Sequence, residues 1–317
     1  MSKSNAQGRA YEFAYLMAFE DIVNQYRKIT IIKNSGYYAA RSAWETIDDV
    51  MRENNLKSAS AGVLTIIESE PLIIENNNDT LEVCIQKDKE GEDGDVRDIL
   101  LVCRKIQWEI GISTKHNHFA VKHSRLSHRL DFGNKWFGVS CSENYWNDIK
   151  PIFDYLKQQK TDGKKWSELP AKEDGIYIPL LNAFLKEIDR SYKIHKDALA
   201  RSMVEYLLGK FDFYKAIGLH RKRITQLQPY NLRGMLNKSS KTHKPKLIIP
   251  VSKLPTRIVH TELKPGSSNT AEIYMDEGWH FSFRIHNAST LVEPSLKFDI
   301  QIIGMPTSII CIDCKWD

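Results

Sequence analysis

The sequence predicts an α/β fold, with a mixed sheet and flanking helices in the first half and an α+β portion at the C-terminal end. Three observations predict this class. Helix-like and strand-like apolar patterns are interleaved in the first 160 residues. Short β-like segments dominate from residue 246 onward. The 317 residues, 42% of them apolar, can fill one large or two ordinary cores.

The first half opens with helices and continues with strands. Apolar residues at helical spacing predict helices over residues 4–26, 38–53 and 58–67. Alternating or continuous apolar segments predict strands over 80–86, 96–103 and 106–115. The acidic, glycine-rich stretch 89–95 predicts a loop, and only Arg104 and Lys105 separate the last two strands, which predicts a hairpin-like meander.

Helices return before the chain becomes mostly β. The later patterns predict helices over 119–130, 144–159, 177–188 and 196–209. They predict strands over 246–251, 256–263, 271–275, 280–286, 296–303 and 309–315. The polar stretch 160–175 is the best boundary, so we expect two domains, residues 1–160 and 161–317.

Composition excludes several classes of protein. The longest wholly apolar run is residues 13–19, well below the roughly 18 residues of a membrane span. The N-terminus lacks the pattern of a secretory signal, and five cysteines are an odd number for a disulfide framework. We therefore expect a cytoplasmic protein without a membrane contact.

Positive charge is concentrated in two blocks. Residues 191–263 hold 15 Lys or Arg and four acids, although the whole chain has a net charge of only +5. Residues 115–129 hold four Lys or Arg, four histidines and no acid. Such blocks are typical of a surface that binds phosphate groups. The alternative is that these side chains solvate exposed loops.

One strand carries a candidate metal site. In a strand over 106–115, Glu109, Gly111, Ser113 and Lys115 share one face. With Asp98 on the neighbouring strand, this face offers two carboxylates for Mg²⁺ beside an ammonium group, a combination suited to phosphodiester hydrolysis. Alternatively, Glu109 and Lys115 pair on a solvated face and Asp98 ends a turn.

A third carboxylate is aligned with the apolar stripe of the first helix. At about 100° per residue, Glu12 falls in line with Leu16, Phe19 and Val23. An acid there needs a cation nearby or belongs to a site, because a buried unpaired charge is costly. The alternative is an acid that is favoured near the helix N-terminus and pairs with Arg9.

Two segments offer groups for DNA. The expected helix 119–130 would begin at a cluster suited to phosphate binding, and the strand 280–286 would present polar side chains suited to base edges. The candidate DNA-binding residues, with Arg9, are Asn117, Lys122, His123, Arg125, Arg284 and Asn287.

Together these residues resemble the HaeIII family of type II restriction endonucleases. The resemblance extends from residue 7 to about residue 303. It rests on the motifs QGRAYE (7–12), GDVRD (94–98), EIGISTKHN (109–117), KHSRLS (122–127) and FSFRIHNAS (281–289). It implies a restriction-endonuclease-like core of the PD-(D/E)xK group, Mg²⁺-dependent cleavage of double-stranded DNA at GGCC, a prokaryotic source and a companion DNA methyltransferase.

The active-site motif departs from the usual pattern of that group. Ser113 stands where an acid is expected two residues before Lys115, and Gly111 stands where a lysine would follow Glu109. We therefore expect Asp98, Glu109, Lys115 and Glu12 to be catalytic and the three carboxylates among them to bind the metal. Asp95 is a rival to Asp98, and either Glu109 or Glu12 would supply the second carboxylate.

These expectations assign a role to each domain. Residues 1–160 would form the nuclease core with the N-terminal helix and the metal site, and residues 161–317 would grip and recognise DNA. A palindromic target favours a homodimer, although a monomer that cuts twice is possible. The alternatives are a structure-specific repair or recombination nuclease and a non-catalytic DNA-binding regulator on a nuclease fold.

Overall fold

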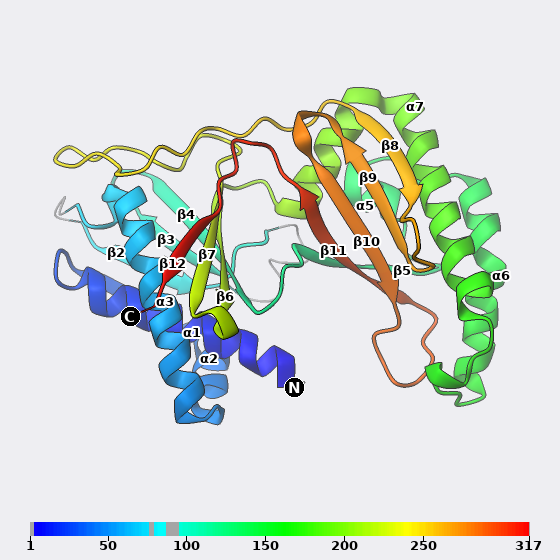
Figure 1. Cartoon of the computed structure of the whole chain (residues 1–317), viewed down its shortest axis with the longest axis horizontal. Helices are drawn as coiled ribbons and strands as arrows, with labels where there is room; N and C mark the ends of the chain where they lie inside the picture. Colours follow the sequence, from blue (N-terminus) through cyan, green and yellow to red (C-terminus); the bar gives the residue numbers. More distant parts are fainter. Residues whose placement is uncertain (1–2, 76–78, 87–94, 317) are drawn as a thin grey trace. The chain divides into compact units, whose positions relative to one another are not determined.

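The computed structural model describes residues 3–75, 79–86 and 95–316 (Figure 1). The chain forms two compact units, each built from separate segments. The first unit contains residues 1–119, 210–253 and 307–317, and the second contains residues 120–209 and 254–306. Both units combine helices with a sheet, as expected for the α/β class.

The first unit is built on a seven-stranded mixed sheet in the order β1-β2-β3-β4-β6-β7-β12. Its strands are β1 (Ile29–Ile32), β2 (Leu81–Ile85), β3 (Ile99–Cys103), β4 (Trp108–His116), β6 (Phe213–Leu219), β7 (Ile224–Tyr230) and β12 (Ile312–Lys315). The pairs β1–β2 and β4–β6 are parallel and the others are antiparallel. The central pair β4–β6 therefore joins strands that are far apart in the sequence.

Three helices cover one face of this sheet. They are α1 (Lys3–Val23), α2 (Ser35–Thr46) and α3 (Asp49–Ser69), followed by the short η1 (Pro71–Ile73). The side chains of Asn34 and Asp48 cap α2 and α3 by accepting hydrogen bonds from Tyr37 N and Met51 N. Residues at alternate positions of β3 and β4, such as Ile99 and Ile112, join the core beneath these helices. On the opposite face, β4 presents Glu109, Ser113 and Lys115, whereas β3 presents Leu100 and Val102.

The second unit packs a five-stranded antiparallel sheet against helices. Its strand order is β5-β11-β10-β9-β8. The strands are β5 (Lys122–Leu126), β8 (Ile258–Leu263), β9 (Thr270–Met275), β10 (His280–His286) and β11 (Leu296–Gly304). The helices are α5 (Phe132–Phe137), α6 (Glu143–Thr161) and α7 (Ile178–Leu208). An aromatic cluster of Phe132, Trp136, Phe184, Phe283 and Phe298 joins α5 and α7 to the sheet.

The remaining helical elements are single turns. They are η2 (Trp166–Glu168), η3 (Glu173–Tyr177), η4 (His220–Lys222) and η5 (Asp276–Gly278).

Many predicted elements are confirmed with small shifts of their ends. The first helix, the strand at 80–86, the meander of β3 and β4, helix α6 and strands β8 to β11 all occur. The helices expected at 38–53 and 58–67 are α2 and α3, which meet at residues 47–48. The two helices expected over 177–209 are one element, α7, with a kink at Lys196. The loop expected at 89–95 lies outside the described residues, apart from Asp95.

Two predicted elements are wrong, and three strands were not predicted. The helix expected at 119–130 is replaced by strand β5, in which Ser124 and Leu126 are buried while His123 and Arg125 are exposed. That period of two is a strand pattern. Strands β1, β6 and β7 were not expected, and residues 246–251 form an irregular segment rather than a strand.

The compact units also differ from the expected division into residues 1–160 and 161–317. Residues 160–175 lie inside the second unit, because α6 and α7 both pack there. Strands β6, β7 and β12 belong to the same sheet as β3 and β4, although they come from the second half of the sequence. No helix in the described ranges is both long and apolar enough to cross a membrane.

Candidate active site

Polar side chains gather on the face of β4 that points away from the helices. Ile110 and Ile112 face the helical core, so Glu109, Gly111, Ser113 and Lys115 lie on the other face, as predicted. This alternation follows from the period of two in a strand. The site is therefore built on a rigid central strand of the sheet.

Asp98 lies at the Lys115 end of this face. Its Oδ2 accepts hydrogen bonds from Thr114 N at 2.7 Å, Ser113 Oγ at 3.2 Å and Lys115 Nζ at 3.3 Å. The backbone of Asp98 is also held, because its N–H donates to Ile112 O and its carbonyl accepts from Gln86 N. The structure thus brings Asp98 and Lys115 together, holds the backbone of Asp98 on both sides and fixes its carboxylate through Oδ2.

The donor set around Asp98 suits a hard divalent cation. Among the described residues, none donates a hydrogen bond to Asp98 Oδ1, and 26% of the side chain is exposed. The Ser113 hydroxyl lies beside the carboxylate, so the two side chains here that could coordinate a metal ion both offer oxygen atoms. Oxygen ligands with room for water are what Mg²⁺ requires. These residues therefore fit the metal that the sequence predicts.

Asp95, the rival of Asp98, has other partners. Its carboxylate binds the Arg97 guanidinium at 2.7 Å and accepts a hydrogen bond from Gln86 Nε2 at 2.9 Å. Burial by itself would raise the pKa of Asp95, but the hydrogen bonds from Arg97 and Gln86 outweigh burial and lower it. The structure favours Asp98 over Asp95 as the carboxylate beside Lys115.

Glu109 also contacts Arg97 rather than Asp98. Its Oε1 lies 2.6 Å from Arg97 Nη1. Glu109 precedes Ser113 by four strand positions, which corresponds to about 13 Å at about 3.3 Å per residue. That separation is too large for Glu109 and the carboxylate next to Ser113 to share one metal ion. The geometry therefore argues against Glu109 as the second ligand.

Glu12 and Arg9 lie on α1, which packs against β4 on the helical side of the sheet. The apolar stripe predicted for this helix is confirmed, since Leu16, Phe19 and Val23 are buried, and Glu12 at its start is half-buried. Arg9 is buried, with 8% of its surface exposed. Little of Arg9 is therefore open to a DNA phosphate.

The sequence interpretation missed Lys215. This residue lies on β6 directly opposite Ser113, in the parallel pair β4–β6. It is buried, and its Nζ donates a hydrogen bond to Phe119 O at 2.6 Å. Burial lowers the pKa of Lys215 to about 7, and the positive charge of Lys115 adds to that effect. The apolar residues on both sides of Lys215 are the sequence signal that this lysine lies in a buried strand.

Asn117 stabilises the turn after β4. It adopts a left-handed backbone conformation with φ of 52°, which asparagine tolerates better than most residues. Its N–H donates to Gly218 O, and its Oδ1 accepts from His220 N at 3.1 Å. These bonds join the ends of β4 and β6, so Asn117 has a structural role here.

The DNA-binding residues expected at a helix start lie on strand β5 instead. Lys122 Nζ donates to Tyr206 O at 2.8 Å and lies over the Tyr206 ring. His123 and Arg125 point to the other face of the sheet, where His123 lies 4.0 Å from Asp299 and Arg125 donates to Ser295 Oγ at 3.0 Å. Only His123 and Arg125 are exposed among these three.

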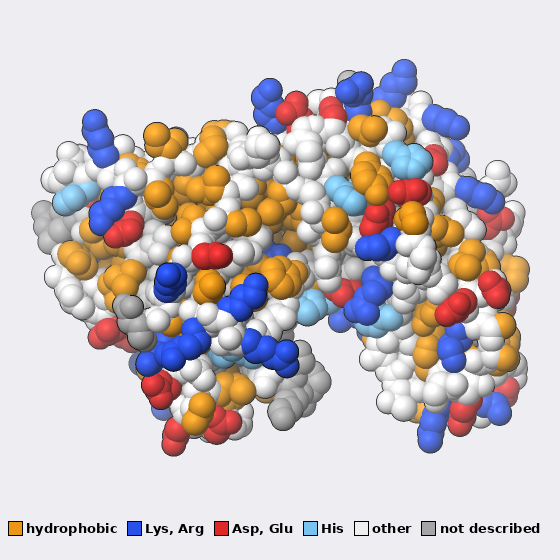
Figure 2. All heavy atoms as spheres, in the orientation of Figure 1, with side chains coloured by type: hydrophobic (Ala, Val, Ile, Leu, Met, Phe, Trp, Pro, Cys, Tyr) orange, Lys and Arg blue, Asp and Glu red, His pale blue; other side chains and the backbone are white. Residues whose placement is uncertain are grey.

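Arg284 and Asn287 are engaged within the second unit. Arg284 Nη2 lies 2.9 Å from Asp299 Oδ2 on the neighbouring strand, and more than half of the Arg284 side chain is exposed. Asn287 Nδ2 donates to Ser289 O and to Leu291 O. Figure 2 shows basic, acidic and histidine side chains side by side over this sheet. To bind a base edge, Arg284 would have to break its ion pair with Asp299.

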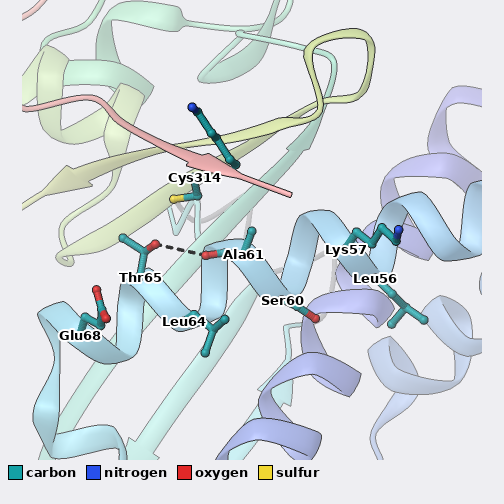
Figure 3. Close-up of a pocket in the computed structure, with 9 residues that line it drawn as sticks. Leu56, Lys57, Ser60, Ala61, Leu64, Thr65, Glu68 and Cys314 are labelled. Atoms are coloured by element: carbon teal, nitrogen blue, oxygen red, sulfur yellow. Dashed lines mark hydrogen bonds between the residues drawn. The ribbon is translucent and has the colours of Figure 1, made fainter. Parts of the chain in front are cut away.

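A separate groove lies along α3. Its volume is about 420 Å³, and Figure 3 shows side chains of α3 together with Cys314 of β12 along it. It is lined by Leu56, Lys57, Ser60, Ala61, Leu64, Thr65, Glu68, Cys314 and Lys315. None of the predicted site residues lines this groove, which is built on the helical side of the sheet.

Comparisons with known proteins agree with the resemblance seen in the sequence. A family model described as "HaeIII restriction endonuclease" matches residues 8–306. The chain is 53% identical over 316 residues to "Type II restriction enzyme HaeIII" of Haemophilus aegyptius. That alignment covers 100% of this chain and 99% of the relative. No solved structure matches the chain.

Proposed function

The chain belongs to the HaeIII restriction endonuclease family of type II restriction enzymes, and from that premise we propose that it hydrolyses double-stranded DNA at GGCC with Mg²⁺ as cofactor. The single observation that supports this mechanism is the contact between Asp98 and Lys115. Their oxygen and nitrogen atoms lie 3.3 Å apart on a sheet face that also presents a serine hydroxyl. Such a pair can hold a divalent cation and orient a water molecule, the two tasks of metal-assisted phosphodiester hydrolysis.

Asp98 and Ser113 would hold the metal. Bound there, Mg²⁺ supplies a Lewis acid for the phosphate oxygens and lowers the pKa of bound water. Asp98 would contribute its carboxylate, which the hydrogen bond from Thr114 N to Oδ2 keeps in one orientation. Glu12 stays the second carboxylate that the sequence proposes, but α1 packs on the opposite face of β4, so Glu12 would have to reach the metal around the end of that strand.

Lys115 would orient the attacking water and offset the negative charge on the phosphate. Its ammonium has three donors, one of which is used by Asp98. In the hydrolysis, the oxygen of water forms a bond to phosphorus, the bond to the 3′ oxygen breaks and a proton passes to that oxygen. No covalent bond between enzyme and DNA is needed.

The partners follow from the substrate. A twofold-symmetric target favours a homodimer with one site for each strand. A companion DNA methyltransferase would protect host DNA, and the cytoplasm would contain both proteins. Among the DNA-binding candidates, Asn117, His123, Arg125 and Arg284 are exposed and stay proposed contacts.

The test compares Asp98→Ala and Lys115→Ala with the wild type on plasmid DNA in Mg²⁺. Removing either group should lower the cleavage rate at least about 100-fold, as for other groups that act in the transition state. Binding to a GGCC duplex in Ca²⁺ should change little. Arg104→Ala is the matched control, because Arg104 pairs with Glu82 on the exposed surface of the same sheet.

The pattern of wild-type products distinguishes the alternatives. Discrete limit fragments that end at GGCC support restriction, a smear supports a structure-specific repair nuclease, and intact DNA with retained binding supports a regulator. Full activity of Asp98→Ala or of Lys115→Ala would remove that residue from the mechanism.

A further inference from the structure

An arginine with very little exposed surface lies next to the proposed catalytic carboxylate. The side chain of Arg97 is only 4% exposed, although it precedes Asp98 directly in the chain. Its guanidinium contacts Asp95 at 2.7 Å and Glu109 at 2.6 Å and lies 4.0 Å from the centre of the Phe211 ring. Two carboxylates and an aromatic face thus surround one buried cation.

Gly111 makes room for this arginine. A Cβ at position 111 would lie 2.0 Å from Arg97 Cδ and 2.4 Å from its Cγ, so no other residue fits there without moving Arg97. The absence of a side chain at position 111 thus has a physical reason. The aliphatic part of Arg97 lies against β4 at position 111. If Glu109 were the acid of the PD-(D/E)xK motif, its lysine would stand at that position.

The arginine links three strands at the site. Asp95 accepts hydrogen bonds from Gln86, the residue after β2, and from the N–H of Arg97 itself. Glu109 belongs to β4, and the backbone of Asp98 is hydrogen bonded to Gln86 on one side and Ile112 on the other. Asp98 therefore lies inside a network that spans β2, the start of β3 and β4.

We propose that Arg97 is a positioning residue that holds Asp98 at Lys115, and that Glu109 acts by anchoring Arg97 rather than by binding metal. The proposal rests on the proposed nuclease function, since Asp98 is catalytic only within it. The buried network fixes the path of the chain at residues 95–98, and that path directs the Asp98 carboxylate to Thr114 N and Lys115. A displacement of about 1 Å in a reacting group can cost about 100-fold in rate.

The first test measures single-turnover cleavage of a GGCC duplex at saturating DNA over a range of Mg²⁺ concentrations. Arg97→Met should lower the maximal rate about 100-fold without changing the affinity for DNA in Ca²⁺. Gly111→Ala should act in the same direction with no change of charge. Arg97→Lys should recover only part of the rate, because lysine cannot bridge two carboxylates as the planar guanidinium does. Arg104→Met is the control.

Glu109→Gln separates the two roles of Glu109. The amide oxygen can still accept the hydrogen bond from Arg97, so the loss of rate should stay below about 10-fold. A loss as large as that of Asp98→Ala would mean that Glu109 binds the metal, and it would overturn the proposal.

The second test needs no metal and no cleavage. Hydrogen exchange of the Thr114 amide reports its bond to Asp98. Exchange should become faster in Arg97→Met and in Gly111→Ala and stay unchanged in Arg104→Met. If the arginine variant cleaves and exchanges like wild type while Asp98→Ala is inactive, the positioning role is wrong and the nuclease function stands. If Asp98→Ala remains active, the proposed mechanism itself is wrong.

Discussion

At the scale of single residues, Glu70 gives the pH dependence that is easiest to measure. It is fully buried, and its Oε1 accepts hydrogen bonds from Tyr214 Oη at 2.7 Å and Asn237 N at 2.6 Å. Its Oε2 is buried and has no partner among the described residues. Burial raises the pKa of Glu70 from 4.5 to about 7, against the opposing effect of those hydrogen bonds.

The sign of the effect follows from proton binding. Between these two pKa values the native state holds a proton that the unfolded state has lost, so the contribution of Glu70 to stability falls as the pH rises from 4.5 to about 7. The expected loss is about 3 kcal/mol. Glu70→Gln should remove this loss and be more stable than wild type at pH 8 in urea denaturation. Glu68→Gln, on the surface nearby, is the control. If the free energy of unfolding changed with pH in the same way in wild type and in Glu70→Gln, the raised pKa would not belong to Glu70.

The sequence could predict which residues share a face but not which of them touch. The period of two correctly placed Glu109 and Lys115 on one side of β4, and the neighbouring-strand argument correctly brought Asp98 to Lys115. The sequence could not show that Arg97 would form an ion pair with Glu109, because that contact depends on the space that Gly111 leaves for the arginine. Lys215 was missed because its neighbour in space lies about a hundred positions earlier in the chain.

At the scale of elements, Asp212 holds the loop after β7 against the start of β6. Its carboxylate accepts hydrogen bonds from the N–H groups of Leu232 and Arg233 at 2.7 Å and of Met235 at 2.6 Å. Asp212→Ala would leave these N–H groups without their acceptor. Each buried donor that loses its partner costs about 1–3 kcal/mol of stability. We expect a loss of about 3 kcal/mol or more in the free energy of unfolding.

Urea denaturation measures this loss. Asp313→Ala is the matched control, because Asp313 accepts a hydrogen bond from Gln226 on the exposed surface of the same sheet and should matter by less than about 0.5 kcal/mol. Equal losses in the two variants would show that the buried donors find other partners.

Elements with a clean period were predictable, and elements specified by distant partners were not. The alternation of Phe281, Phe283 and Ile285 gave β10 with its observed ends. Strand β6 is buried on both faces and contains a lysine, so its pattern has no alternation to detect. The basic residues of β5 were interpreted as the start of a helix. They form a strand because residues 122–126 pair with β11.

At the scale of the whole molecule, a long basic block spans residues 210–253, which hold eleven Lys or Arg and one acid. All of these cations except Lys215 are exposed. Arg221, Lys222 and Arg223 lie in and after η4, at the sheet end where β4 and β6 finish in parallel. This turn is therefore at the same end of the sheet as Lys115.

Replacing Arg221, Lys222 and Arg223 with glutamine should weaken DNA binding and its salt dependence. Each phosphate that the protein no longer neutralises reduces the slope of log K against log salt by roughly 0.9, so the slope should fall by up to about 3. Lys150, Lys157 and Lys160 on α6 are also exposed, and the same replacement there is the control. If plots of log K against log salt had the same slope for wild type and for the η4 variant, this turn would be excluded from the DNA interface.

The pairing of β4 with β6 also governs when activity can arise during synthesis. The chain completes Asp98 and Lys115 early, but the strand that lies beside them begins at Phe213, after most of another folding unit has been made. A nascent chain that stops near residue 160 has the proposed catalytic pair, Asp98 and Lys115, without the central strand of their sheet. The sheet that carries Asp98 and Lys115 is therefore incomplete until residues 213–230 and 312–315 have been made.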